Sequence, residues 1–234
     1  MCLRYGKTLI PVLFENDSCM VLNKPSGLPV QGGEGVKVSL DSILSQNYSP
    51  RPFLVHRLDK DTSGIILVAK TKEAAGGFSA LFARTRDSGS PKGKGVGEVK
   101  KNQAIIKQYL GLCVGNPGAG VIRLNLDVRG KEREAETFYR VLSDETIGGI
   151  SCSLLELELG TGRMHQIRRH LAHIGHPLLG DDKYGDFSLN KTLRKACGLK
   201  HLLLHASRLV IPPSPGLIPE GLDISAPLPE YFKL

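Results

Sequence analysis

The chain has 234 residues, of which 41% are hydrophobic, so it can bury a core as one large domain or two subdomains. Its formal net charge of +8 indicates a polyanionic partner, and charge alone leaves RNA, DNA and an acidic membrane surface open. No apolar run approaches the ~20 residues of a membrane span, so no membrane partner is expected. The five cysteines are widely spread and have no CxxC spacing, so a zinc finger is not expected. Their odd number and wide spread indicate free thiols in a reducing compartment.

The first residues, MCLRYGKTLIPVLFEN, contain neither the apolar region nor the cleavage site of a secretory signal. We therefore expect an intracellular protein. Its place is the cytoplasm or, where a targeting peptide has been removed from a longer precursor, a mitochondrion or plastid.

The first half of the chain predicts three strands and two helices. Short apolar runs at residues 9–14 and 19–22 indicate strands. Residues 39–46 predict a short helix, because their leucines and isoleucine fall on one helical face. The run IILVA at residues 65–69 follows a glycine and is apolar throughout, which is typical of a strand buried on both faces. Residues 72–84 predict a second helix with an apolar stripe.

Residues 85–103 have no core-forming pattern and are rich in glycine and lysine. From Arg84 to Lys101 there are six basic and two acidic residues, a net charge of +4. We expect a flexible basic loop. Its glycines form only a broken GxGxG outside any strand-to-helix setting, so a nucleotide-binding loop is not favoured. A solvated linker and a contact to an RNA backbone both remain open for it.

The second half predicts strands at residues 107–115, 122–128, 135–142 and 155–159. The second and fourth of these alternate apolar with polar or charged side chains, as half-buried strands do. Several antiparallel strands in succession, with few and short helices, indicate an α+β fold with a broad sheet and exclude a doubly wound fold.

A helix after the last of these strands carries both apolar and basic side chains. Ile167, Leu171 and Ile174 form its core stripe, with Met164 close by. At about 100° per residue, Arg168 lies at the flank of this stripe. A partly buried guanidinium at that place needs an anionic partner.

One charged loop stands out at residues 56–64, HRLDKDTSG, between two apolar segments. A loop held at the mouth of a buried strand is a common place for catalytic groups. Arg57 and Lys60 flank Asp59, and nearby positive charge favours the ionised carboxylate. A surface turn whose acids and bases pair with one another fits the same residues.

The phrase HRLDKDTSG closely resembles the catalytic signature of the RluA-type enzymes in the RsuA/RluA family of RNA pseudouridine synthases. Three further segments resemble motifs of this family in the same order. NKPSGLPV resembles "NKPxGxxV", and KQYLGLCVG resembles "KxYxAxVxG", with glycine where alanine is common. TGRMHQIRRHLAHIGHPLLGDDKYG resembles "TGRxHQIRxHLxxxGHPxxGDxxYG". These segments are residues 23–30, 107–115 and 161–185, and the resemblance extends over residues 14–232, interrupted by the basic insertion.

The resemblance implies an α+β pseudouridine synthase fold: a mixed, mostly antiparallel sheet in two subdomains, flanked by short helices, with a central RNA-binding cleft. It implies one catalytic domain over residues 9–234, with residues 85–103 as an insertion and no S4-type RNA-binding module. The implied activity is the isomerisation of specific uridines in structured tRNA or rRNA to pseudouridine after base flipping. Because the reaction involves no redox change and no added group, we expect no cofactor and no metal. We also expect a monomer that binds RNA.

The resemblance also assigns roles to single residues. Asp59 matches the essential aspartate, which acts as the nucleophile or as the base that starts the reaction. Tyr109 matches the tyrosine against the target base, where its ring stacks and its hydroxyl can handle a proton. Arg168 matches the arginine that pairs with the catalytic aspartate. Arg57 matches the residue that fills the gap left by the flipped base.

Further residues are candidates for contact with the RNA backbone. Arg163 is assigned to a phosphate, and Arg169 points away from the core stripe toward solvent or phosphate. His165 is expected at a helix cap or on the RNA. Lys92 and Lys94 are the candidates in the basic insertion.

Two other classes of function remain open on the sequence. A non-catalytic RNA-binding protein could retain the fold, although a pure binder has no need of a carboxylate such as Asp59 in an anionic groove. A magnesium phosphotransferase could use Asp59 and Asp61 with Asp181 and Asp182, and activity that survives EDTA would remove this alternative. The clustered histidines offer neither HExxH nor an evident third ligand, so zinc is not favoured.

Overall fold

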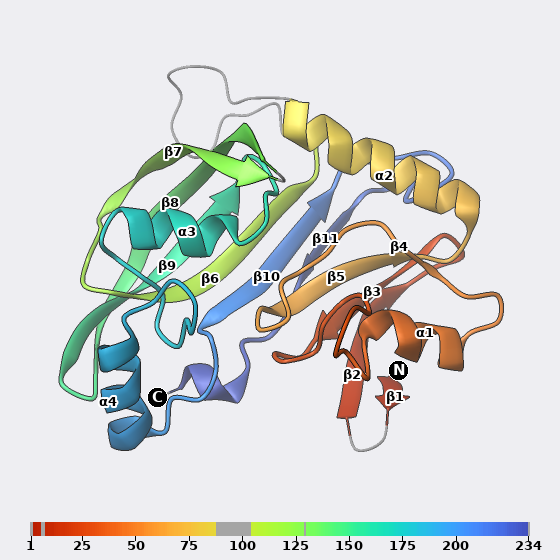
Figure 1. Cartoon of the computed structure of the whole chain (residues 1–234). Coiled ribbons are helices and arrows are strands. Elements are labelled where there is room, and N and C mark those ends of the chain that lie inside the picture. The colour runs from red at the N-terminus through yellow and green to blue at the C-terminus, as the bar shows by residue number, and fades with distance from the viewer. Residues whose placement is uncertain (1, 6–7, 88–103, 129, 234) are drawn as a thin grey trace. The chain divides into compact units, whose positions relative to one another are not determined.

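The computed structural model describes residues 2–5, 8–87, 104–128 and 130–233 (Figure 1). The chain forms two compact units. Unit 1 comprises Met1–Ile106 and Ala206–Pro227, and unit 2 comprises Lys107–His205 and Leu228–Leu234. No helix in the described part of the chain is long and apolar enough to cross a membrane.

Unit 1 contains a sheet whose strands follow the order β1, β2, β3, β5 and β10, with β4 beside β5 and β11 beside β10. The pairs β1–β2, β2–β3 and β3–β5 are antiparallel. The strands are β1 (Cys2–Tyr5), β2 (Thr8–Glu15), β3 (Cys19–Lys24), β4 (Phe53–Leu54), β5 (Ser63–Ala69), β10 (Leu204–Ile211) and β11 (Leu222–Ser225).

Two helices, α1 (Leu40–Asn47) and α2 (Lys72–Asp87), complete unit 1. Ser39 caps α1, because its side chain and that of Ser42 each accept a hydrogen bond from the other's backbone N–H. Every residue of β5 is buried, as its apolar run predicts. The phenylalanines of α2 belong to the same core cluster as β5, which explains the apolar stripe of that helix.

Unit 2 contains an antiparallel sheet in the order β6, β9, β8 and β7. Helix α3 contacts β7 and β8, and the core includes side chains from β6, β9 and α4. The elements are β6 (Ile106–Val114), β7 (Ala119–Val128), β8 (Lys131–Ile147), β9 (Ile150–Leu159), α3 (Gln166–His173), α4 (Phe187–Cys197) and the 3₁₀ turn η1 (Glu230–Phe232).

The predicted α+β class is confirmed, and all five cysteines are free thiols as expected. Two local expectations are wrong. The second helix continues to Asp87, so the first three residues of the predicted 85–103 insertion are helical, while Lys92 and Lys94 lie outside the described residues. Met164 does not lie in the core: it is 56% exposed, because α3 begins two residues later, at Gln166.

Candidate active site

The charged loop of unit 1 lies between β4 and β5. Strands β3 and β5 pair antiparallel with Lys24 opposite Gly64, so the end of β3 meets the start of β5. Gly64 has a φ of +107°, and a Cβ at this position would lie 2.2 Å from the carbonyl oxygen of Ala206. Only glycine permits this backbone conformation together with so close an approach of β10.

Lys24, the lysine of the NKPSG segment, is fully buried. Its Nζ donates hydrogen bonds to the carbonyl oxygens of Pro25, Leu28 and Lys60, each at 2.9 Å. Burial lowers the pKa of Lys24 to about 7, against the opposing influence of the negative charges of Asp61 and Asp59. Lys24 therefore ties the end of β3 to the charged loop and places its amino group near the two carboxylates of that loop.

Other contacts fix the same loop at both ends. The backbone N–H of Gly27 donates to the carbonyl of Lys60 at 2.9 Å, and the hydroxyl of Ser26 donates to the carbonyl of Asp61 at 2.8 Å. At the start of the loop, Nε2 of His56 accepts a hydrogen bond from the backbone N–H of Leu67 at 2.8 Å. The His56 ring also packs on Phe82 of α2, with centroids 4.6 Å apart.

Asp59 lies in the middle of this anchored loop. Its neighbour Leu58 is buried, Asp59 itself is half-buried, and Arg57 is exposed. The buried leucine anchors the backbone while the charged side chains remain accessible. The loop therefore presents a carboxylate on a backbone that is fixed before any substrate binds, which is what a catalytic group requires.

In unit 2, Arg168 of α3 forms a buried ion pair with Asp181. Its Nε and Nη2 donate to the two carboxylate oxygens at 2.8 and 2.7 Å, the bidentate geometry that suits a guanidinium. Nη2 also lies 3.4 Å from the carboxylate of Asp182, and the guanidinium carbon lies 5.3 Å from the ring centre of Tyr184. The prediction that Arg168 is buried and needs an anionic partner is confirmed.

Asp181 is held by more than the arginine. Its Oδ1 accepts hydrogen bonds from the backbone N–H groups of Lys183 and Tyr184, each at 2.9 Å. Burial acts to raise the pKa of Asp181, but the hydrogen bonds from Arg168, Tyr184 and Lys183 outweigh it and hold this pKa below its ordinary value. Asp181 is therefore an ionised anchor that fixes the orientation of Arg168.

The segment before α3 is fixed by Gln166. Its side-chain amide donates to the carbonyl of Glu136 at 2.8 Å and to the hydroxyl of Thr137 at 3.0 Å, both on β8. Its oxygen accepts from the hydroxyl of Thr161 at 2.6 Å and from the backbone of Arg163 at 3.0 Å. Gln166 thereby holds the TGR segment against the sheet.

The predicted RNA-contact residues of unit 2 surround this segment. His165 occupies the N-cap position of α3 with a left-handed φ of 52°, but its side chain makes no capping hydrogen bond. Its Nδ1 lies 3.1 Å from the hydroxyl of Tyr184. Arg163 reaches the carbonyl of Glu134 at 3.4 Å. Arg169 is half-buried and reaches the carbonyl of Asp127 at 3.4 Å.

Tyr109 lies on β6, opposite Leu157 of β9, and is mostly buried. Two residues along the strand, Gly111 stands where alanine is common in the family. A Cβ there would lie 2.9 Å from a methyl carbon of Leu178 and 3.2 Å from one of Leu157. The close packing of these two leucines explains the glycine.

The structure divides the predicted site residues between the units. Arg57 and Asp59 belong to unit 1, whereas Tyr109 and Arg168 belong to unit 2. The pairing of Arg168 with Asp59 therefore stays a prediction. Within the described ranges no group of three or more His, Cys, Asp or Glu side chains is arranged to hold a metal ion.

Sequence reasoning missed three residues that shape the site: Lys24, Gln166 and Asp181. Lys24 and Gln166 lie inside motifs that were recognised but were given no role of their own. Asp181 was considered only as part of a metal site, although the expected burial of Arg168 called for an acid and the motif GDDKYG offered one. The need of a buried charge for a partner points to an acid but does not choose Asp181 over Asp59.

Comparisons with known proteins identify the family of the chain. Residues 18–173 match the family model described as RNA pseudouridylate synthase. The chain is 36% identical to "Ribosomal large subunit pseudouridine synthase C" of Escherichia coli K12, over 95% of this chain and 67% of the relative. It is 31% identical to the protein of the same name in Rickettsia typhi, over 94% and 69% of the two chains. The solved structure "Human RNA Pseudouridylate Synthase Domain Containing 4" matches with a TM-score of 0.69 and 28% identity, over 95% of this chain and 90% of that one. The chain therefore belongs to the RNA pseudouridylate synthase family, and it is an isomerase that converts uridine in RNA to pseudouridine.

Proposed function

We propose that the substrate is RNA of the large ribosomal subunit and that the reaction starts at Asp59. The choice of RNA is supported by the Escherichia coli and Rickettsia typhi relatives, both of which are named for the large ribosomal subunit. The observation that carries the choice of Asp59 is its loop, whose backbone is held by Lys24, Ser26 and Gly27 through three hydrogen bonds of 2.8–2.9 Å.

The reaction needs no oxidant and no donor group. The bond between C1′ of the ribose and N1 of the uracil breaks, the base turns, and a bond from C1′ to C5 forms. The proton on C5 leaves and N1 ends the reaction protonated, so atoms and electrons balance. Asp59 opens this sequence, either by attack on the sugar or the base or by removal of the 2′ proton.

The other roles follow from the chemistry of the side chains. Arg168 keeps the carboxylate of Asp59 charged, since an opposite charge nearby lowers a carboxyl pKa. A guanidinium has five N–H groups, and two of them donate to Asp181 at short distance, which fixes the orientation of this charge. Tyr109 stacks on the target base, where its hydroxyl is the candidate for relaying the C5 proton to solvent. Arg57 fills the gap that the flipped base leaves in the RNA.

Three further side chains, Arg163, His165 and Arg169, contact the RNA around the flipped nucleotide. Arg163 and Arg169 each donate to a backbone carbonyl at 3.4 Å, a long contact that a phosphate can replace. We also propose that the protein acts as a monomer, which light scattering after gel filtration tests directly. A mass near 25.4 kDa is expected, and a dimer mass would contradict it.

Carbodiimide primer extension, which marks pseudouridine as a stop, tests the choice of substrate. Unmodified large-subunit rRNA and unmodified tRNA are incubated with the wild type, with Asp59→Ala and with Asp61→Asn, in the presence of EDTA. We expect new stops on large-subunit rRNA for the wild type and for Asp61→Asn, and none for Asp59→Ala. Stops on tRNA alone would overturn the substrate proposal, and stops with Asp59→Ala would overturn the role of Asp59.

A further inference from the structure

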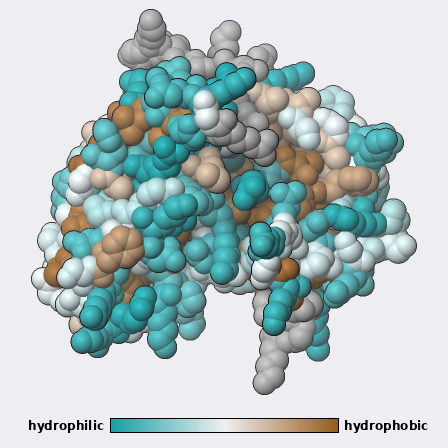
Figure 2. Space-filling view, viewed as in Figure 1, coloured by the Kyte–Doolittle hydropathy of each residue, from teal (hydrophilic) through white to brown (hydrophobic). Residues whose placement is uncertain are grey.

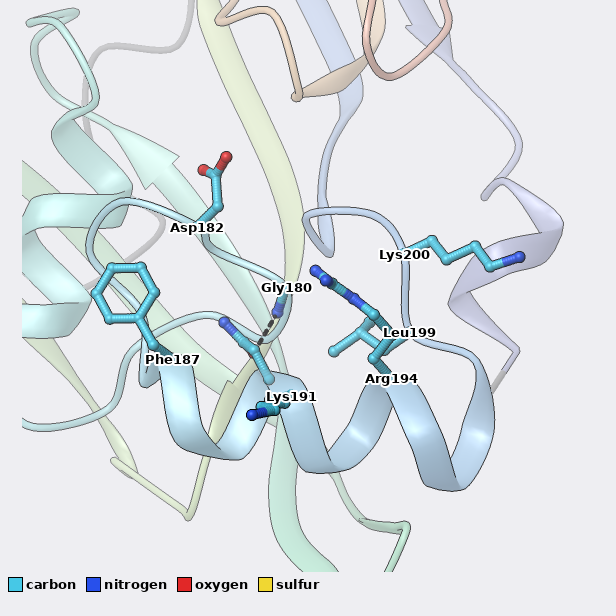
Figure 3. A pocket seen from close by; sticks show the side chains of 8 residues that line it. Gly180, Asp182, Phe187, Lys191, Arg194, Leu199 and Lys200 are labelled. Carbon is cyan, nitrogen blue, oxygen red and sulfur yellow. Dashed lines mark hydrogen bonds between the residues drawn. The ribbon is translucent and has the colours of Figure 1, made fainter.

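A cavity of about 290 Å³ lies beside α4 in unit 2 (Figure 3). This volume is close to the lower end of the ~300–1,000 Å³ that small-molecule sites span, so it suits one ring system with its substituents rather than a large cofactor. Helix α4 contributes one face to the lining, because the positions involved are three and four residues apart. The lining residues are Gly180, Asp182, Phe187, Asn190, Lys191, Arg194, Leu199 and Lys200.

The wall of the cavity is rigid. Asn190 of α4 is buried, its side-chain oxygen accepts from the backbone N–H of Gly180 at 2.9 Å, and its amide donates to the carbonyl of Asp181 at 2.9 Å. Gly180 has a φ of +74°, and a Cβ there would lie 1.9 Å from the carbonyl oxygen of His201. The turn that lines the cavity is thus the turn whose Asp181 holds Arg168.

The lining carries more positive than negative charge. Lys191, Arg194 and Lys200 are exposed, and in the described part of the chain none of them forms an ion pair with a carboxylate. The acidic lining residue, Asp182, already lies 3.4 Å from Arg168. Three cations without acidic partners around one cavity attract an anion with more than one charged group.

An aromatic ring completes the lining. Phe187 is 63% exposed and rises from the first turn of α4, on the same side as Arg194, toward the turn that carries Gly180 and Asp182 (Figure 3). In the space-filling view, hydrophilic residues with hydrophobic residues between them cover the surface around α4 (Figure 2). An exposed aromatic ring beside cations is the combination with which proteins bind single-stranded nucleic acid, since every base has a face that stacks.

We propose that this cavity binds one unpaired nucleotide of the RNA substrate, with its base stacked on Phe187 and the adjoining phosphates on Arg194, Lys191 and Lys200. The proposal rests on the activity of the family, not on the role of Asp59. The cavity shares its wall with the Arg168–Asp181 pair, because the turn of Gly180 and Asp181 belongs to both. The site adds affinity for the RNA strand beyond the nucleotide that reacts.

Tryptophan fluorescence tests the stacking. The chain contains no tryptophan, so Phe187→Trp introduces a single reporter. Titration with a single-stranded 12-nucleotide RNA of mixed sequence is expected to quench its emission to saturation, and a duplex of the same sequence is expected to leave it unchanged. Thr192→Trp, exposed on another face of α4, is the matched control and should stay unquenched. Equal quenching in both variants, or quenching by the duplex, would overturn the proposal.

Affinity and its salt dependence test the two halves of the site separately. Phe187→Ala is expected to weaken binding of the 12-nucleotide RNA roughly 5- to 100-fold, the effect of removing one stacked base, and Phe187→Tyr to restore it. The triple change of Lys191, Arg194 and Lys200 to Ala should reduce the slope of log affinity against log salt by about 0.7 for each phosphate that is no longer neutralised. Lys195→Ala, an exposed lysine outside the cavity, should change neither quantity.

All the substituted side chains are exposed, so the variants should melt at the wild-type temperature. Wild-type affinity of Phe187→Ala for the 12-nucleotide RNA would overturn the proposal. So would weakened binding in the triple variant with no effect of Phe187→Ala, since charge alone would then account for the binding. Competition by uridine monophosphate as strong as that by the RNA would assign the cavity to a free nucleotide and overturn the assignment to the strand.

Discussion

The ion pair between Arg168 and Asp181 allows a quantitative test of how the site is held. Asp181→Ala removes a carboxylate that accepts two hydrogen bonds from Arg168 and two from backbone N–H groups. The Arg168 side chain is 4% exposed, so its charge would stay buried after these two short hydrogen bonds are lost. Loss of one partner of a buried pair costs about 3–5 kcal/mol. That is a large share of the ~5–15 kcal/mol by which a typical domain is stable.

Urea unfolding at neutral pH measures this loss. Asp182→Asn is the matched control, because its carboxylate is 79% exposed and its replacement should change the free energy of unfolding by no more than about 0.5 kcal/mol. The double variant Arg168→Met, Asp181→Ala should lose less free energy of unfolding than the sum of the two single variants, because Arg168→Met removes the guanidinium that Asp181 otherwise binds. A loss under about 1 kcal/mol in Asp181→Ala, or strict additivity in the double variant, would refute the reasoning.

Two further predictions concern unit 1. The pKa of Lys24 is lowered from its ordinary value of 10.5 to about 7 in the folded chain. Below pH 7 the fold therefore buries a charged amine, which lowers the free energy of unfolding, and this destabilisation decreases as the amine loses its proton at higher pH. The free energy of unfolding of the wild type relative to Lys24→Met should therefore increase by about 2 kcal/mol from pH 7 to pH 9, and a difference independent of pH would contradict this. Gly64→Ala should destabilise by more than the roughly 1–3 kcal/mol of backbone strain, because its Cβ would also meet the Ala206 carbonyl. Gly76→Ala, in an open position on α2, should stabilise the fold by about 0.5–1 kcal/mol. Equal melting temperatures for Gly64→Ala and Gly76→Ala would contradict both expectations.

The longer strands and three of the helices could be predicted because they depend on local patterns, whereas β1, β4, β10, β11 and α4 were not predicted. The apolar run that became β5 and the alternation in β7 and β9 are readable residue by residue. The helix angle also placed Arg168 at a buried flank. The predicted ends of elements were less accurate where no proline or capping residue marks them, as at the end of α2.

The contacts that fix the site could not be predicted, because they join residues far apart in the chain. A lysine in a segment of prolines and glycines is ordinarily exposed, and Lys24 is buried only because three carbonyls converge on it, one of them from Lys60. The helix angle shows that Arg168 needs an acid but does not say which one. Asp181 became identifiable only when the turn after α3 was seen to return to the helix.

Asp59 is the residue on which the proposed mechanism depends, because it starts the isomerisation. Since C5 of the uracil exchanges its hydrogen for the bond to the ribose, RNA labelled with tritium at that carbon releases the label into water with each turnover. Large-subunit rRNA labelled in this way should release tritium with the wild type and with Asp61→Asn. It should release none above background with Asp59→Asn, whose side chain has the same shape without the charge. Tritium release by Asp59→Asn at the wild-type rate would contradict this role of Asp59.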